Sequence, residues 1–464
     1  MELKIVEKLC HRFPNHPALK LGPGDDAAIM EIIGSSPEIV VSTDLLTEGV
    51  DFLLERMNPR KIGRKALAVN LSDLAAMAAE PLACVISVAL PRKPRFPVPE
   101  DFTRINSPME TDFTHSESDG TPLETDFSTQ LKTDKTPAET DFSTQSKTDY
   151  TSAETIPPRG IFLPRDQKPT GTDTAQLMEF LCDGFLDAVY ETAHAGEKIA
   201  EKWKHFTENG ANVSKNSGII PKNSENVSEN AEKIADFPRI ATIPTAIAGG
   251  DTNFWDGPLV ISVTVIGKVR EKPLCRHHAR PGDAIFVTGP LGGSILRRQF
   301  NFMPRIPEML ALNQAFPLSA GMDISDGLTL DLARLCQRSK CRAELFLDEI
   351  PIHTDARTLA ELGTNSELET TKSTIYDWIP TSLTGGTALE HALGDGEDFE
   401  VLFTVPWELS NELRENQLGI PVYRIGRMLE SHVSDITDST ENLILGSRNG
   451  SDAVPIPIRG FQHG

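Results

Sequence analysis

The sequence has few cysteines, and none of them are arranged in pairs. Six cysteines are scattered over 464 residues, and no C-x-x-C motif occurs. This spacing argues against a disulfide framework and a zinc site, so we expect reduced thiols in a cytoplasmic protein. Long hydrophobic runs are also lacking, because the longest, Leu82 to Leu90, is far too short to span a bilayer. The first seven residues carry acids where a signal peptide needs an apolar core, so we expect none.

Positive charge is in short supply. The chain has 45 lysines and arginines against 67 acidic residues, a formal net charge of −22 at pH 7. Nucleic acids and anionic membrane surfaces attract clustered basic residues. We therefore expect neither a nucleic acid nor a membrane as a partner. Hydrophobic residues make up 39% of the chain, which allows a folded core, and the length suits two or three domains.

Three polar stretches interrupt the patterned parts of the sequence, at about 101–172, 196–242 and 364–386. The first contains the sequence Glu-Thr-Asp-Phe three times. One Phe per repeat buries too little apolar area to offset the entropy lost on ordering. We interpret all three stretches as insertions and expect the first two to be disordered, except that Glu197 to Phe206 of the second also fits an extension of the preceding helix. A repeat that binds a partner is the alternative for the first.

Helical and strand patterns follow one another outside these insertions. Apolar residues at helical spacing predict helices over 61–79, 176–192 and 328–338. Short apolar runs predict strands over 38–42, 82–90, 244–249, 259–269, 283–288 and 400–405. Because helices and strands mix without a strict βαβ order, the predicted class is α+β or mixed α/β.

Acidic residues beside glycines, or at the ends of predicted elements, are the candidates for chemistry. Neither a phosphate-binding G-x-x-x-x-G-K-[ST] loop nor G-x-G-x-x-G after a strand is present. The acidic motifs are Gly24–Ala28, Ser42–Asp44, Asn70–Asp73, Gly249–Thr252, Asp323–Gly327 and Gly394–Asp398. Each motif alone also fits a turn or a helix cap, with Ser325 or Asp326 as a candidate cap. Asp73 differs, because an acid between Leu71 and Leu74 is unfavourable unless something positive binds it.

Taken together, these acidic motifs predict a cluster of hard oxygen ligands. Carboxylates with few His or Cys neighbours favour Mg²⁺ or Mn²⁺ over zinc or copper. Ions held in this way usually serve phosphate chemistry, since they bridge phosphate oxygens and neutralise developing charge. A divalent ion also explains how an acidic protein binds a polyanion, because the ion reverses the local sign of the field.

The motifs and their order resemble the thiamine-monophosphate kinase family, within the aminoimidazole-ribonucleotide-synthetase-like superfamily. The resemblance covers about 1–100, 173–195, 243–363 and 387–464. It implies direct transfer of the γ-phosphate of ATP to thiamine monophosphate, with several magnesium ions. It also implies a two-domain fold and a homodimer. An ATP- and magnesium-binding dimerisation domain would span 1–270, and an α/β domain 271–464.

The resemblance also implies the residues of the site. The magnesium ligands would be Asp26, Ser42, Thr43, Asp44, Asp73, Asp251, Asp323 and Asp326. The ATP contacts would be Gly250, Asp251, Arg276 and Ser325, with an ordinary surface residue as the alternative for Arg276. The acceptor contacts would be Asp51, Glu397 and Phe461. Two positions depart from the family pattern, because Asp51 replaces a histidine and Asp395 replaces a glycine.

No residue is needed as an acid or base. A phosphate monoester has a second pKa of about 6, so the acceptor is already mostly deprotonated at pH 7. Two alternatives stay open at this point. One is a member of the same superfamily with another acceptor, such as an aminoimidazole-ribonucleotide or selenophosphate synthetase. The other is a non-catalytic paralogue that binds a nucleotide or a metal.

Overall fold

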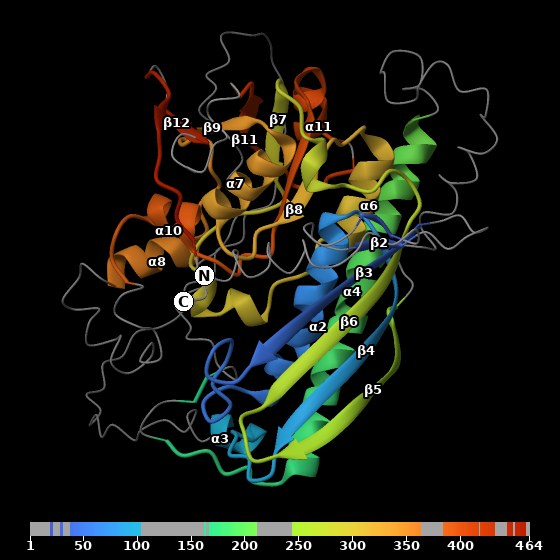
Figure 1. Cartoon of the computed structure of the whole chain (residues 1–464), viewed down its shortest axis with the longest axis vertical. Coiled ribbons are helices and arrows are strands. Elements are labelled where there is room, and N and C mark those ends of the chain that lie inside the picture. The colour runs from blue at the N-terminus through green and yellow to red at the C-terminus, as the bar shows by residue number, and fades with distance from the viewer. Residues whose placement is uncertain are drawn as a thin grey trace, which may run out of the picture.

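The structure is a computed structural model of the whole chain. It describes residues 19–21, 28–30, 38–103, 162–163, 167–210, 244–362, 384–416, 418–431, 443–448 and 451–460. Two β-sheets and the helices packed on them make up this part of the chain (Figure 1). The predicted mixed α/β class is therefore confirmed. None of the described helices combines the length and hydropathy needed to cross a bilayer.

Within the described residues, the first sheet has six strands in the order β1-β2-β3-β6-β4-β5. They are β1 (Leu19–Leu21), β2 (Ala28–Met30), β3 (Glu38–Thr47), β4 (Glu80–Pro91), β5 (Ala246–Trp255) and β6 (Val260–Val269). Neighbouring strands are antiparallel except β4 and β5, which are parallel. Helices α2 (Pro59–Ala76) and α4 (Thr174–Gly210) pack together along one face of this sheet (Figure 1). The alternating burial of β6 fits a sheet with one face in the core.

The second sheet has seven strands among the described residues, in the order β13-β12-β9-β11-β7-β10-β8. They are β7 (Asp283–Val287), β8 (Gly321–Asp323), β9 (Arg342–Phe346), β10 (Val401–Pro406), β11 (Tyr423–Leu429), β12 (Ile444–Ser447) and β13 (Val454–Pro455). Its helices are α6 (Ile306–Ala315), α7 (Leu328–Ser339), α8 (Thr354–Leu362), α10 (Ala388–Gly394) and α11 (Ser410–Arg414). Short 3₁₀ turns are η2 (Arg276–His278), η3 (Ser294–Leu296), η4 (Arg298–Phe300) and η6 (Trp407–Leu409).

Helix α2 contacts both halves of the molecule. It packs on β3 and β6 of the first sheet and on β8 and β10 of the second. Its fully buried Leu67 and Leu71 belong to the same hydrophobic core as Phe286 and Phe403 of the second sheet. The core-facing residues of α2 are therefore fixed between the two sheets. The predicted domain boundary near residue 270 falls between β6 and β7 and stays a prediction.

The predicted helices and strands are found, and several are longer than expected. Helix α4 continues to Gly210, so the start of the predicted insertion at 196–242 is helical. Strand β5 runs through the motif Gly249–Thr252, which lies inside a strand and not after it. The rest of that insertion, 211–242, lies outside the described residues, as do residues 364–383 of the third stretch.

The two ends of the first predicted insertion are part of the fold. Helix α3 (Pro99–Thr103) contains the buried Asp101, whose carboxylate accepts the backbone N–H groups of Val98 at 3.0 Å and Thr170 at 3.1 Å. Phe162 is also buried. The boundaries at 101 and 172 were therefore too wide. The Glu-Thr-Asp-Phe repeats, and the expectation of disorder, fall on residues outside the described ranges.

Candidate active site

A cavity of about 750 Å³ lies beside α2 and is lined by residues of both halves of the chain. Strand β3, the loop that follows it, η3 and the segment 394–399 contribute to its wall. Eight of the residues expected in the site line this one cavity. They are Thr43, Asp44, Asp51, Asp73, Asp323, Ser325, Asp326 and Glu397. The fold thus brings together acids that are up to 353 residues apart in the sequence, as Asp44 and Glu397 are.

One stripe of α2 runs along the cavity. Lys65, Val69 and Asp73 are spaced by four residues and all line it. The helix begins with Pro59 after Asn58, whose side chain accepts the backbone N–H of Arg60, a favourable start. At 1.5 Å per residue, the backbone positions of Lys65 and Asp73 are about 12 Å apart along the axis. The stripe therefore presents an ammonium group toward one end and a carboxylate toward the other.

Hydroxyl groups hold two of the acids at the Asp73 end. Ser42 donates to Asp73 Oδ2 at 2.5 Å, from the face of β3 that is turned to α2. Ser72 donates to Asp323 Oδ2 at 2.8 Å. Hydrogen bonds to a carboxylate are stronger than those between neutral groups, so these contacts fix the direction of each acid. The hydroxyl of Thr43 instead donates to the carbonyl of Val263 at 3.0 Å.

Asp326 is bound by an arginine from the helix that follows it. Arg334 Nη1 lies 2.5 Å from Asp326 Oδ2 and 2.7 Å from Asp331 Oδ1. Burial raises the pKa of Asp331 to about 7, with Arg334 opposing the shift. Asp331 also accepts the backbone N–H groups of Asp326 and Gly327 at 3.0 Å each. Asp331 therefore holds the start of α7. The alternative in which Ser325 or Asp326 caps this helix is wrong, since the cap position is Gly327.

The acids of the cavity suit magnesium by type but do not form a closed cage. Among the residues that the structure describes, no three His, Cys, Asp or Glu side chains converge closely enough to hold an ion alone. Mg²⁺ usually keeps several waters and takes one or two carboxylates together with substrate phosphates. Asp44, Asp73, Asp323 and Asp326 line one cavity and offer only oxygen donors, so they fit ions that also bind phosphate.

Lys65 forms a buried ion pair near the other end of the stripe. Its Nζ lies 2.6 Å from Glu397 Oε1, 3.3 Å from Gln299 Oε1 and 3.4 Å from the carbonyl of Asp51. Neither Lys65 nor Gln299 was predicted from the sequence to have a role in the site. The reasoning that singled out Asp73 also applies to Lys65, because Lys65 too is a charged residue among the apolar residues of this helix. Asp51 uses a carboxylate oxygen to accept the backbone N–H of Thr47 at 2.7 Å, which closes the loop after β3.

The segment 395–399 has an unusual backbone. Asp395 is extended, with φ −69° and ψ 137°, so an aspartate in place of glycine causes no strain there. Glu397 and Phe399 have φ of +60° and +49°, in the left-handed region that costs residues other than glycine about 1–2 kcal/mol each. Asp398, between them, accepts the backbone N–H of Gly292 with both oxygens at 3.0 Å. Strain held in this way is typical of a functional site.

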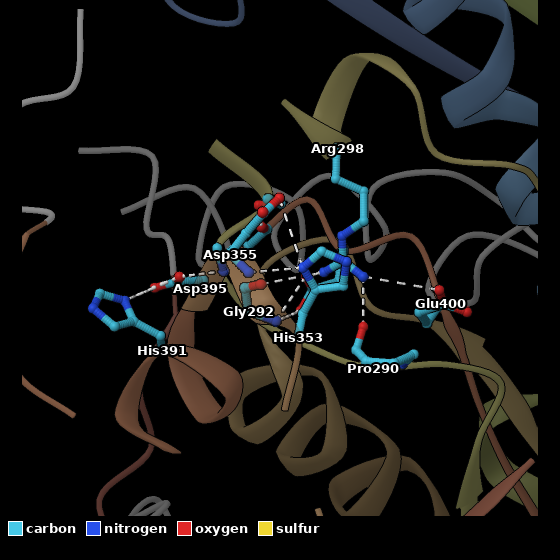
Figure 2. Close-up of polar contacts among 12 residues, drawn as sticks. Pro290, Gly292, Arg298, His353, Asp355, His391, Asp395 and Glu400 are labelled. Atoms are coloured by element: carbon cyan, nitrogen blue, oxygen red, sulfur yellow. Dashed lines mark hydrogen bonds and ion pairs between the residues drawn. The ribbon is translucent and has the colours of Figure 1, made fainter. Parts of the chain in front are cut away.

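Arginine and histidine side chains tie this segment to its neighbours (Figure 2). Arg298 contacts Asp398 and donates to the carbonyl of Pro290 at 2.5 Å. Arg305 donates to both carboxylate oxygens of Glu400, at 2.7 and 2.8 Å. Burial alone would raise the pKa of Glu400, but the charge and hydrogen bonds of Arg305 outweigh burial and hold this pKa below its usual range.

The pKa values of the two histidines in Figure 2 are shifted in opposite directions. Burial and Arg298 lower the pKa of His353 to about 4, so its ring is neutral at pH 7 and accepts the backbone N–H of Asp355 at 3.0 Å. His391 has Asp395 at 3.0 Å from Nδ1 and the carbonyl of Gly385 at 2.7 Å from Nε2. Burial alone would lower the pKa of His391, but these two acceptors outweigh burial and raise it.

Six expected residues are not among the described residues that line the cavity. Gly250 and Asp251 lie on β5, an exposed edge strand. Arg276 lies in η2, and its carbonyl accepts the hydroxyl of Ser339 at 2.6 Å. Asp26 and Phe461 are outside the described residues, although Gly460, next to Phe461, lines the cavity. Their roles stay predictions, as does that of Ser42, which reaches the cavity through Asp73.

Comparison with known proteins relates the chain to one group of enzymes. Residues 24–113 match the family model described as AIR synthase related protein, N-terminal domain. The thiamine-monophosphate kinase of Rhodopirellula baltica is 28% identical over 435 residues, which cover 92% of this chain and 90% of that protein. The thiamine-monophosphate kinase of Bacillus subtilis is 23% identical, over 96% of this chain and 97% of its own.

Solved structures agree on the fold. AaThiL, complexed with AMPPCP and TMP, matches with a TM-score of 0.52 at 18% identity, over 100% of this chain and 96% of its own. A Thermus thermophilus protein matches with a TM-score of 0.52 at 19% identity, over 98% of both chains. The expected fold is thus confirmed. The two relatives that align over nearly the whole chain are both thiamine-monophosphate kinases. The chain is similar over nearly its whole length to thiamine-monophosphate kinases, and its residues 24–113 match the N-terminal domain of the AIR synthase related proteins.

Proposed function

We propose that this protein transfers the γ-phosphate of ATP to thiamine monophosphate in a magnesium-dependent reaction and releases thiamine diphosphate. The observation that carries the proposal is one cavity whose charged groups are divided along α2. Four acids, from β3, α2 and the segment 323–326, line one part of the cavity, and the Lys65–Glu397 ion pair lines another. The chain is also 28% identical to a thiamine-monophosphate kinase over nearly its whole length.

The acids would hold magnesium together with the phosphates of ATP. Asp44, Asp73, Asp323 and Asp326 line the cavity, and the proposed set also includes Asp26, Ser42, Thr43 and Asp251. Magnesium neutralises the charge of the phosphates and lines up donor and acceptor. The protein contributes the hydroxyl groups of Ser42 and Ser72, which keep two carboxylates in fixed directions. Preorganised groups of this kind lower the barrier because they need not reorient during the reaction.

ATP and thiamine monophosphate would share the cavity. Ser325 lies at its wall between Asp323 and Asp326, which suits a contact to ATP. Gly250, Asp251 and Arg276 complete the proposed ATP contacts. Asp51, Glu397 and Phe461 are the proposed acceptor contacts, and the position of Gly460 at the wall supports Phe461. No side chain is assigned as an acid or base, since the acceptor phosphate is mostly deprotonated at pH 7.

We also propose a homodimer in the cytoplasm. Strand β5 is an exposed edge of the first sheet, and its Ile247, Phe254 and Trp255 are 42%, 49% and 42% exposed. Exposed apolar side chains beside an open edge are typical of a surface that binds another chain. The five cysteines within the described ranges are free thiols, which suits a reducing compartment. Sedimentation of the parent and of Phe254→Glu tests the dimer, and a parent monomer would contradict it.

The reaction is tested with purified protein, ATP and thiamine monophosphate, by chromatography of the products. Thiamine diphosphate should form, together with one ADP per product, and EDTA should abolish its formation. Magnesium added in excess should restore it. A different phosphorylated product from another acceptor would favour a relative with changed specificity. ATP binding without any turnover would favour a non-catalytic paralogue.

A further inference from the structure

The structure assigns a role to Lys65 that the family resemblance did not suggest. We propose that Lys65 is a positioning residue for the acceptor: its ammonium group holds the Glu397 carboxylate in the direction in which it meets thiamine monophosphate. This inference rests on the proposed function and adds one residue to it. Three observations carry it: the contacts of Lys65, the exposure of the two partners and the distribution of charge in the cavity.

The contacts of Lys65 explain how its charged ammonium group can be buried. The side chain is 1% exposed, and a charge so deeply buried is unfavourable unless it is paired and hydrogen-bonded. Glu397 Oε1, Gln299 Oε1 and the carbonyl of Asp51 lie within 2.6 to 3.4 Å of Nζ and can take its three protons. The ring of Phe300 adds a cation–π contact at 4.9 Å. The ammonium group is thus fixed from several sides.

The two partners are exposed to very different degrees. Glu397 is 35% exposed, against 1% for Lys65, so a ligand in the cavity meets the carboxylate and hardly the ammonium group. Lys65 holds Oε1, and within the described residues no hydrogen bond is formed by Oε2. The backbone N–H of Glu397 donates to the carbonyl of Ser325 at 2.6 Å. The carboxylate is therefore anchored by its backbone and by one oxygen, and the other oxygen is available to a ligand.

The charges of the cavity explain why this carboxylate needs a lysine. Seven of the lining residues are acids: Asp44, Asp51, Asp73, Asp323, Asp326, Asp395 and Glu397. Among the described residues that line it, Lys65 is the only lysine or arginine. Without it, Glu397 would add an uncompensated negative charge to a cavity that must admit two phosphate-bearing substrates. The ion pair keeps a strong hydrogen-bond acceptor at the wall without that net charge.

The role is tested by steady-state kinetics of Lys65→Met, Glu397→Ala and the double variant. We expect the KM for thiamine monophosphate to rise about tenfold in Lys65→Met, the effect of losing one charge-assisted contact. The KM for ATP should stay within about twofold, because the acids at the other end are untouched. Lys61→Met, one turn earlier on the same helix and not at the cavity wall, is the matched control and should leave both constants unchanged.

The double variant separates positioning from a general structural role. If Lys65 acts through Glu397, adding Lys65→Met to Glu397→Ala should change the KM for thiamine monophosphate by less than about twofold. Effects of the two substitutions that multiply would overturn the inference. So would equal rises in the KM values of both substrates in Lys65→Met.

Three further outcomes decide between the alternatives. If Lys65→Met does not fold, as judged by circular dichroism, then Lys65→Arg and Glu397→Ala decide. Each should raise the KM for the acceptor and not that for ATP, and an unchanged acceptor KM in either would overturn the inference. If the unmodified protein makes no thiamine diphosphate, the proposed function fails, and this inference fails with it. If the parent turns over and Lys65→Met matches it, only the role of Lys65 is refuted.

Discussion

Replacing Glu400 by glutamine should destabilise the protein strongly at neutral pH. The carboxylate is 5% exposed and accepts two hydrogen bonds from Arg305, at 2.7 and 2.8 Å, and one from Thr288 at 2.6 Å. A second arginine is also close, because Arg298 Nη1 lies 4.0 Å from Glu400 Oε1. Glutamine keeps the shape but removes the charge that compensates two largely buried guanidinium groups. Breaking a buried ion pair in this way costs about 3–5 kcal/mol, so we expect a loss within that range.

The matched control is Glu55→Gln, which removes an acid whose partner Arg95 lies 4.0 Å away with both side chains more than half exposed. Exposed pairs contribute about 0–1 kcal/mol, so this variant should unfold like the parent. Unfolding in urea at pH 7 and 25 °C, followed by circular dichroism, measures both. A loss in Glu400→Gln no larger than that in Glu55→Gln would refute the reasoning.

The pH dependence gives a second check on the same residue. Because the pKa of Glu400 is held below its ordinary value, its contribution is present above the unfolded pKa of about 4.3. It is lost as the pH falls through the lower pKa of the folded state. The difference between parent and Glu400→Gln should therefore shrink in acid. A difference that is the same at pH 7 and pH 3 would contradict this account.

Two further predictions concern His391, which contacts the cavity residue Asp395, and Asp51, which lines the cavity. His391→Gln should destabilise the protein more at pH 6 than at pH 9 in thermal unfolding. The raised pKa of His391 contributes stability that is complete below about 6.5 and is lost as the pH rises through its folded value, so equal shifts at both pH values would refute the reasoning. Asp51→Asn should leave the KM for thiamine monophosphate equal or lower, because asparagine still accepts the N–H of Thr47 without a negative charge. A clear rise in that KM would mean that the carboxylate itself binds the substrate.

Much of the fold could be predicted from the sequence because its patterns are local. Apolar residues at helical spacing indicated α2, and β6 was placed to within one residue at its start, since each pattern reflects burial on one side. Strand β5 was harder, because its residues are exposed throughout and its glycines are typical of turns. The ends of the first insertion were missed because Asp101 and Thr170 bind each other across a gap that no local pattern spans.

The acids of the site could be predicted from the sequence, but its ion pairs could not. Repeated motifs of acids and glycines indicated Asp44, Asp73 and Asp323, which the fold brings to one cavity. The pairing of Lys65 with Glu397 joins residues 332 positions apart, and neither side chain alone indicates the other. Asp395 raised the question of strain, and its ordinary backbone conformation answers it. Such contacts depend on how the two sheets meet across α2, which sequence patterns do not specify.

The most direct test of the central claim is thiamine diphosphate formation by the parent and by Asp73→Asn, with ATP, thiamine monophosphate and Mg²⁺. Asparagine can still accept the hydroxyl of Ser42, so the fold should be retained while one negative metal ligand is lost. We predict turnover by the parent and a loss of about 100-fold or more in the variant, the scale of one electrostatic contact in a transition state. Equal turnover by a folded Asp73→Asn, or none by the parent, would contradict the account.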